Sequence, residues 1–250
     1  MNTHARPSHL ANGQELNSLA AIDDFPCRVQ NRWSQLGVPA SSVWMSRNLA
    51  PSDYQGPTLG IIGTRRPSIA GLQIVEDLVL AISKLPQPPL IVSGGAFGID
   101  RRAHHSALNR NLKTHAWVVG PCTRPGPKGS DGLFEKLRLA EGSGWCVPEE
   151  LEPTPERHPL PSWWLLRNAY MVACCDALVV AEAQEKSGTW ATVRMANELG
   201  LRVFAAPTNY HNLHGRGTNQ MIADSYAEPI VGIKELMGTL VEEIWPNSYN

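Results

Sequence analysis

The chain lacks a strong net charge, a long apolar run and an apolar leader, and each absence excludes a class of protein. Its 22 lysines and arginines are balanced by 23 aspartates and glutamates, so the total charge does not demand a polyanionic partner. No run of about 18 apolar residues occurs, which excludes a membrane-spanning helix. Because the opening segment has no apolar signal core, we expect a cytoplasmic protein.

The motifs of common metal and cofactor sites are missing as well. The five cysteines include the adjacent pair Cys174 and Cys175 but no CxxC spacing, so we expect reduced thiols and no metal site. Neither a GxGxxG fingerprint nor a GxxxxGKS/T loop is present, which argues against a dinucleotide dehydrogenase and a P-loop ATPase. We therefore expect no cofactor.

The first half of the chain is net basic and the second half is net acidic. This distribution indicates either a local basic surface or charges that are scattered over a solvated surface.

Short apolar runs alternate with helical periods from residue 58 onward. Nearly continuous apolar strands separated by helices are typical of a parallel sheet with helices on both faces. We predict an α/β fold with a doubly wound, mostly parallel sheet of the extended Rossmann-like type. The predicted strands are 58–63, 90–92, 116–119, 144–147, 177–180, 202–206 and 230–231, and the clearest predicted helices are 99–109, 188–199 and 232–243.

Composition also divides the chain into three parts. Residues 1–55 are polar and rich in turn formers, which indicates an N-terminal extension that packs partly on the main domain and frays at its start. Residues 56–232 contain the alternating pattern and are predicted to be the Rossmann-like domain. Residues 233–250 are predicted to be a closing helix and tail.

Open parallel sheets bind ligands beyond the carboxyl ends of their strands, and the loops at these positions share one composition here. They combine small and hydroxyl residues, which let a backbone approach phosphate oxygens, with cations that can grip them. One glycine loop alone would also fit a tight turn, but three such loops at one end of a sheet favour an anion pocket. The predicted phosphate-binding residues are Gly63, Thr64, Arg65, Arg66, Ser68, Ser93, Gly94, Gly95, Gly98, Asp100, Lys186, Ser187, Gly188 and Thr189.

Two further features lie near these loops in the sequence. Arg167 and Asn168 follow Trp163 and Trp164, just before a predicted helix; the arginine would hold a phosphate while a base stacks, or the tryptophans would anchor the preceding proline-rich segment. Glu182 ends a strand and is the one carboxylate placed for acid–base work, or else it pairs with a pocket arginine or a helix N-terminus. We assign no catalytic residue otherwise.

The same loops, in the same order, resemble the DNA-processing protein A (DprA/Smf) family. The matching pieces are IIGTRRPSIAG at 61–71, IVSGGAFGIDRRAHHSAL at 91–108, the segment 160–200 and RVFAAPTN at 202–209. The resemblance implies an extended Rossmann fold, non-enzymatic binding of single-stranded DNA, a homodimer, and delivery of a RecA-type recombinase to DNA during natural transformation. It places the DNA contacts at Gly63, Arg65, Ser68, Ser93, Gly94, Gly98, Asp100, Arg167, Asn168, Ser187, Gly188 and Thr189.

This chain departs from the family pattern at two positions. Phe97 and Ala169 stand where the family usually has basic residues, and each lost cation weakens contacts to a phosphate backbone. We expect a divergent member with the Rossmann-like core only, without the family's usual flanking domains.

Two other functions stay open at this point. One is a nucleotide sensor or a nucleoside-monophosphate phosphoribohydrolase related to the Lonely-guy family, with Glu182 as acid or base, although the PGGxGTxxE signature of that family is absent. The other is an interaction protein with a decayed pocket whose surface binds a recombinase.

Overall fold

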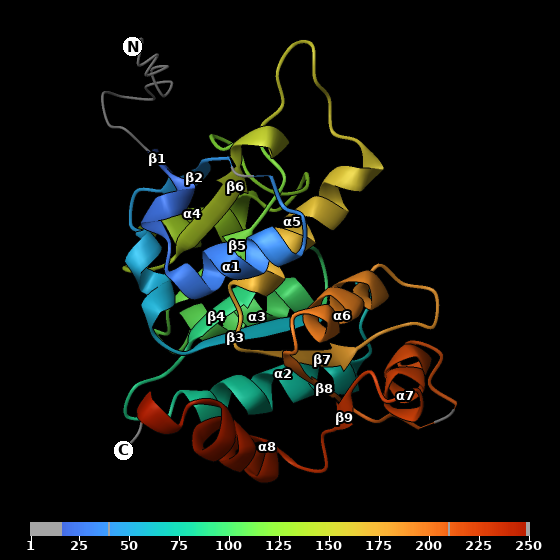
Figure 1. Ribbon diagram of the computed structural model, residues 1–250. Helices are drawn as coiled ribbons and strands as arrows, with labels where there is room; N and C mark the ends of the chain where they lie inside the picture. The colour runs from blue at the N-terminus through green and yellow to red at the C-terminus, as the bar shows by residue number, and fades with distance from the viewer. Residues whose placement is uncertain (1–16, 40, 210, 249–250) are drawn as a thin grey trace.

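A central sheet organises the molecule. The computed structural model describes residues 17–39, 41–209 and 211–248, and these residues form one sheet of nine strands in the order β1-β2-β6-β5-β4-β3-β7-β8-β9 (Figure 1). The strands are β1 (Asn17–Ala20), β2 (Val43–Ser46), β3 (Thr58–Gly63), β4 (Leu90–Ser93), β5 (Thr114–Trp117), β6 (Gly144–Pro148), β7 (Ala177–Glu182), β8 (Arg202–Ala205) and β9 (Glu228–Pro229).

Strand direction confirms the predicted fold class. Every neighbouring pair from β6 across to β9 is parallel, whereas β2 runs antiparallel to both β1 and β6. The chain moves outward from β3 through β4 and β5 to β6, and then returns to β7 on the other side of β3. The sheet is therefore doubly wound, and its strand order reverses between β3 and β7.

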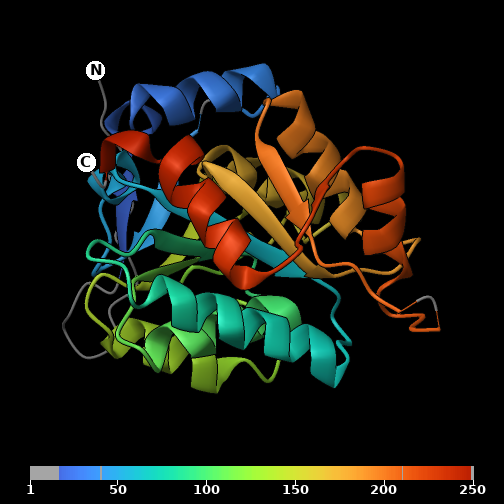
Figure 2. The ribbon, with the colours of Figure 1, turned by 90° about the horizontal axis from the view of Figure 1, so that it is seen from below.

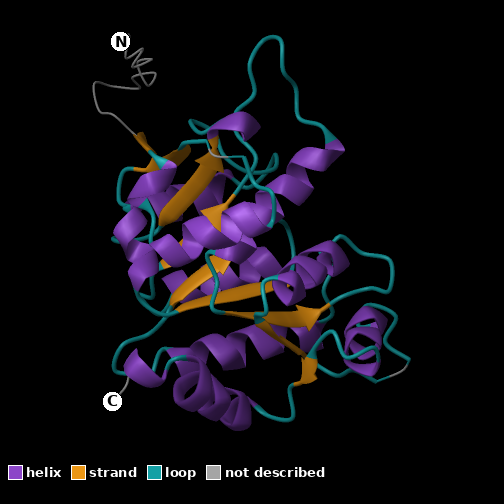
Figure 3. Ribbon diagram, in the orientation of Figure 1, coloured by secondary structure: helices purple, strands orange, loops and turns teal. Residues whose placement is uncertain are grey.

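Helices cover both faces of the sheet (Figure 3). Figure 2 shows α2 and α3 on one side and α1 on the other. One face is packed by α1 (Cys27–Gln35), α5 (Pro161–Ala173), α6 (Thr189–Glu198) and α7 (Arg216–Ala223). The opposite face is packed by α2 (Ile69–Ile82), α3 (Ile99–Leu108), α4 (Asp131–Leu139) and α8 (Ile233–Thr239).

Side chains alternate between the two faces along each strand, as the pleat of a β-strand requires. On β7, Leu178 and Val180 pack with α5 and α6, whereas Val179 packs with α2 and α3. On β8, Phe204 likewise faces the α2 side. All of these side chains are buried, which explains why the strands are apolar at consecutive positions instead of every second one.

The N-terminal segment, which the sequence predicts to be an extension, contributes to the sheet. Strand β2 pairs with β6 from Val43–Pro148 to Met45–Cys146, and β1 pairs with β2. The predicted boundary after residue 55 therefore marks no break in the hydrogen-bonded sheet. The fraying expected at the start of the chain falls on residues 1–16, outside the described residues.

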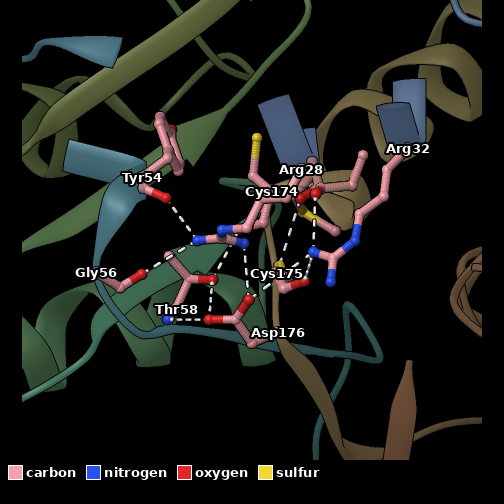
Figure 4. A network of polar contacts seen from close by, with 10 residues as sticks. Arg28, Arg32, Tyr54, Gly56, Thr58, Cys174, Cys175 and Asp176 are labelled. Carbon is pink, nitrogen blue, oxygen red and sulfur yellow. Dashed lines mark hydrogen bonds and ion pairs between the residues drawn. The ribbon is translucent and has the colours of Figure 1, made fainter. Parts of the chain in front are cut away.

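Helix α1 is tied to the centre of the fold by a polar network. The Nη1 of Arg28 lies 2.7 Å from Oδ1 of Asp176, whose carboxylate also accepts from the backbone N–H of Thr58 at 2.9 Å. Nη1 of Arg32 donates to the carbonyl of Cys175 at 2.7 Å. Figure 4 shows both arginines directed at the turn that joins α5 to β7. This network couples the N-terminal segment to the strand beside the reversal of strand order.

Strand β5 begins two residues before the predicted strand 116–119 and ends at Trp117. The prediction missed Thr114 and His115 because their side chains are polar, yet both are buried. The hydroxyl of Thr114 donates to the carbonyl of Ile91 at 3.0 Å, and Nδ1 of His115 lies 3.0 Å from the hydroxyl of Tyr54. Burial is tolerated because each polar group has a partner.

The C-terminal elements also differ slightly from their predicted positions. The last strand, β9, lies two residues before the predicted 230–231 and is two residues long. The predicted helix 232–243 is α8 followed by a π-helical turn at Leu240–Ile244. Within the described part of the chain, no helix combines the length and the apolar character needed to cross a bilayer.

Candidate functional site

A pocket of about 560 Å³ opens at the carboxyl ends of β3, β4 and β7, where the strand order reverses. From this point the chain passes from β3 to α2 on one face and from β7 to α6 on the other, so the two loops diverge and leave space between them. We call this space the phosphate pocket. The predicted residues that line it are Gly63, Thr64, Arg65, Arg66, Gly94, Asp100, Arg167, Asn168, Lys186, Ser187, Gly188 and Thr189.

Direct backbone contacts hold the three loops together. The N–H of Thr64 donates to the carbonyl of Glu182 at 2.7 Å, and the N–H of Ile99 donates to the carbonyl of Thr64 at 3.2 Å. Gly98 has a φ of +82°, and an added Cβ would lie 2.3 Å from the carbonyl oxygen of Thr64. Only glycine fits this approach. The segments that the sequence predicts to converge are therefore joined in one structure.

Three cations at the mouth of the phosphate pocket have no hydrogen-bond or ion-pair partner among the described residues. Arg65, Arg66 and Lys186 are exposed, and their side chains make no hydrogen bond or ion pair with the described residues. The hydroxyl of Ser187, beside Lys186, is buried and has no hydrogen-bond partner among those residues. Unpaired donors of this kind are available for an anionic ligand.

Arg167 lies at the base of the pocket and is 6% exposed. Its Nη1 donates to the carbonyl of Gly94 and, at 2.7 Å, to the carbonyl of Trp117. Burial lowers the pKa of Arg167 to about 10, so the side chain stays cationic at neutral pH. Its Nε is buried and has no partner among the described residues, which leaves one donor of a buried cation unsatisfied.

Asp100 is the buried carboxylate of the pocket. Desolvation raises its pKa to about 6, against the opposing effects of Arg167, of backbone N–H groups at Ala96 and Gly63, and of Arg65. An Oδ atom of Asp100 accepts from the N–H of Ala96 at 3.4 Å. Asp100 therefore holds the β4 loop and partly compensates the charge of Arg167.

Glu182 does not line the phosphate pocket. Its carboxylate accepts from the backbone N–H and the hydroxyl of Ser68, both at 2.7 Å, and from Nδ2 of Asn212 at 2.9 Å. Ser68 is the N-cap of α2 and also accepts from the N–H of Gly71. Of the roles that the sequence left open for Glu182, these contacts support the one at a helix N-terminus.

Ser68, Ser93, Gly95 and Gly98 were predicted to bind phosphate, but they shape the loops and do not line the phosphate pocket. The hydroxyl of Ser93 is buried and donates to the carbonyl of Ile61 at 2.6 Å. Gly95 has a φ of +66° and packs closely on Val118.

Helix α5 begins at Pro161, earlier than the sequence predicts, and includes both tryptophans. Trp163 is buried with Arg157 lying 5.5 Å over its ring, whereas Trp164 is 39% exposed and lines the pocket. One tryptophan thus anchors the proline-rich segment and the other faces the site. The residues 161, 164, 165 and 168 line the pocket at helical spacing, a signal that the correct helix start would have revealed.

Comparison with known proteins identifies related chains. A family model described as DNA recombination-mediator protein A matches residues 23–241. Protein Smf of Synechocystis is 33% identical over 91% of this chain and 55% of its own length. The DNA processing protein DprA of Bacillus subtilis is 29% identical over 67% of this chain and 54% of its own length. The chain thus spans about half the length of these curated relatives.

Two solved structures share the fold. DprA from Streptococcus pneumoniae superposes with a TM-score of 0.72 at 25% identity, over 88% of this chain and 73% of that one. DprA from Helicobacter pylori superposes with a TM-score of 0.71 at 23% identity, over 91% of this chain and 97% of that one. The Helicobacter pylori structure concerns a single-stranded DNA binding mode of that protein.

Proposed function

This chain belongs to the DNA recombination-mediator protein A family, and from that premise we propose that it binds single-stranded DNA through the sugar-phosphate backbone, at the phosphate pocket. The observation that supports this most is the set of unpaired donors there. The side chains of Arg65, Arg66 and Lys186 make no hydrogen bond or ion pair with the described residues, and Nε of the buried Arg167 has no hydrogen-bond partner among them. Phosphate oxygens would satisfy these donors with charge-assisted hydrogen bonds.

The pocket supports binding without catalysis. The carboxylate proposed for acid–base work, Glu182, is already engaged by three hydrogen bonds away from the lining residues. Trp164 offers a partly exposed ring beside the cations, which suits a strand whose bases are unpaired. The related protein from Helicobacter pylori, whose structure concerns binding of single-stranded DNA, shares this fold. A homodimer and a RecA-type recombinase as protein partner belong to the same proposal.

The proposal is tested by titrating a fluorescent oligo-dT with the protein and measuring anisotropy. We expect micromolar or tighter affinity at low salt. For single strands, each neutralised phosphate contributes a slope of about −0.7 to log K against log salt, so four cations predict a slope of roughly −2 to −3. An absence of binding at low salt would contradict the proposal. A thermal shift with a mononucleotide, and none with oligo-dT, would instead favour the nucleotide-binding alternative.

DNA affinity is expected to rise as the pH falls from 7 to 5. The pKa of Asp100 is raised to about 6, so its carboxylate is charged at pH 7 and neutral at pH 5. Protonation removes the negative charge of Asp100, which interacts with two cations. These are Arg167, on α5, and Arg65, in the loop after β3. Affinity for oligo-dT is measured by anisotropy at fixed ionic strength across this range.

The control for the pH effect is Asp100→Asn, which keeps an oxygen acceptor and has no charge to lose. The variant keeps every other titratable group of the protein, so its pH profile reports the effects of all groups except Asp100. We expect a flatter pH profile for Asp100→Asn than for the unaltered protein. Identical profiles would show that Asp100 does not control the charge of the pocket.

A further inference from the structure

We propose that the outer surface of α3 and α4 is a second anion-binding surface, which holds the DNA strand after it leaves the phosphate pocket; this inference rests on the proposed function. Positive charge is concentrated in this part of the chain. Residues 101–141 contain eight arginines and lysines and three carboxylates, a net charge of +5, although the whole chain carries −1. Helices α3 and α4 pack side by side on the face of the sheet opposite α1 (Figure 2). We call their outer surface, together with the loop 121–130 that precedes α4, the basic face.

Three lysines of the basic face, Lys113, Lys128 and Lys136, make no hydrogen bond or ion pair with the described residues. All three are exposed. The carboxylates of Asp131 and Glu135 are each paired with an arginine of the same face, at 3.6 and 2.6 Å, and so do not pair with the lysines. Exposed cations without partners attract a polyanion, which releases its counterions when they bind it.

The arginines of α3 are only partly compensated by negative charge. Arg102 and Arg110 share one carboxylate, that of Glu76 on α2, at 3.2 and 2.9 Å. The hydrogen-bond partners of Arg101 are neutral, because its Nη2 donates to the hydroxyl of Ser130 at 2.7 Å and to a backbone carbonyl at 3.1 Å. Its Nε is buried and has no hydrogen-bond partner among the described residues. Helix α3 therefore presents more positive charge than its neighbours neutralise.

The cations of the two helices act together on His105, one helical turn after Arg101. Burial lowers the pKa of His105, and the positive charges of Lys136, Arg101 and Arg102 lower it further. Lys136 comes from α4 and the two arginines come from α3. The charges that are concentrated in the sequence are thus close together in space, and they make the potential of this surface positive. A bound polyanion would relieve their mutual repulsion.

Helix α3 joins the basic face to the phosphate pocket. Asp100 in its first turn lines the pocket, and Arg101 is the next residue. Because the helices of a doubly wound sheet run back from the carboxyl ends of the strands, α3 leads away from the pocket. Its ten residues extend about 15 Å. The occupant that this continuity favours is the DNA strand already held at the pocket, and not a separate acidic protein.

Strand length separates the two surfaces in an experiment. Anisotropy titrations compare oligo-dT of about six nucleotides with oligo-dT of about thirty, since single-strand sites span about 4–16 nucleotides. For single strands each neutralised phosphate adds about −0.7 to the slope of log K against log salt. Arg101 and the three unpaired lysines therefore predict a slope that is steeper by roughly 2 to 3 for the long strand than for the short one.

Lys136→Glu is expected to weaken binding of the long strand about fivefold and to leave binding of the short strand unchanged. Fivefold corresponds to about 1 kcal/mol, the upper value for one exposed ion pair. The titrations are made at about 0.1 M salt, where charges more than about 10 Å apart are largely screened. Lys113→Glu, at the far end of the basic face from the pocket, should have the same effect. Thermal melting verifies that each variant folds.

The matched control is Lys234→Glu, because Lys234 is also an exposed helical lysine without a hydrogen bond or ion pair to the described residues, but lies on α8. It should bind both strands like the unaltered protein. The inference would be overturned if the control and Lys136→Glu lost affinity equally, if Lys136→Glu lost the short and long strands equally, or if neither variant of the basic face weakened binding of the long strand. The proposed function stands in each case if Arg65→Glu weakens binding of the short strand. Failure of the unaltered protein to bind either strand would instead refute the proposed function.

Discussion

Replacing Arg65 with glutamate is expected to weaken binding of oligo-dT about 10- to 150-fold at low salt. A hydrogen bond between charged groups contributes about 1.5–3 kcal/mol, and tenfold in affinity corresponds to about 1.4 kcal/mol. Arg65 lines the phosphate pocket, is exposed, and makes no hydrogen bond or ion pair with the described residues, so the substitution breaks no such contact in the fold. The salt dependence should also become shallower, because fewer phosphates are neutralised.

The matched control is Lys84→Glu, which reverses the same charge just beyond the other end of α2. Lys84 is exposed and follows the C-cap Ser83, whereas Arg65 precedes the N-cap Ser68. A helix of 14 residues separates the two charges by about 20 Å. If the two variants lose affinity equally, the protein attracts DNA through positive charges spread over its surface and the phosphate pocket has no special role.

Replacing Trp33 with alanine is expected to lower the free energy of unfolding by about 3–5 kcal/mol. Trp33 is 1% exposed and packs edge-on against Phe25, Trp117 and Tyr170, with ring centres 4.8, 6.1 and 5.4 Å away. Its indole N–H also donates to the carbonyl of Tyr170 at 3.0 Å. The substitution leaves a large cavity between α1, β5 and α5. Urea denaturation, with the midpoint and slope both fitted, measures the loss.

Trp164→Ala makes the same chemical change at a partly exposed site on α5. Because Trp164 faces the phosphate pocket and not the core, we expect the free energy of unfolding to fall by less than about 1 kcal/mol. A similar stability for the two variants would mean that α1 does not share the core of the sheet.

The architecture could be predicted from the sequence because it depends on local patterns. Apolar runs separated by helical periods specify a parallel sheet, and the rule that ligands bind at the carboxyl ends of strands then selects the loops. Thr64–Arg66, Gly94 and Lys186–Thr189 line one pocket for this reason. No knowledge of side-chain contacts was needed to place them together.

Other parts of the site depend on long-range contacts that local patterns do not reveal. Nothing near Glu182 indicates that its hydrogen-bond partners are Ser68 and Asn212, which come from two separate loops. The burial of Arg167 likewise depends on carbonyls at Gly94 and Trp117.

The position of the N-terminal segment also depends on long-range contacts. In the sequence it looks like an appendage, because β2 is short and its partner β6 lies about a hundred residues further along the chain.

The pairing of β2 with β6 has a practical consequence for fragments of this protein. A fragment designed to start at residue 56, where the composition changes, would lack Arg28. The carboxylate of Asp176 would then lose its 2.7 Å ion pair. It would also strip β6 of its antiparallel neighbour and present open backbone donors and acceptors to other molecules. Such bare strands recruit further copies and aggregate. A fragment that is expressed in order to study the pocket should therefore begin upstream of Asn17.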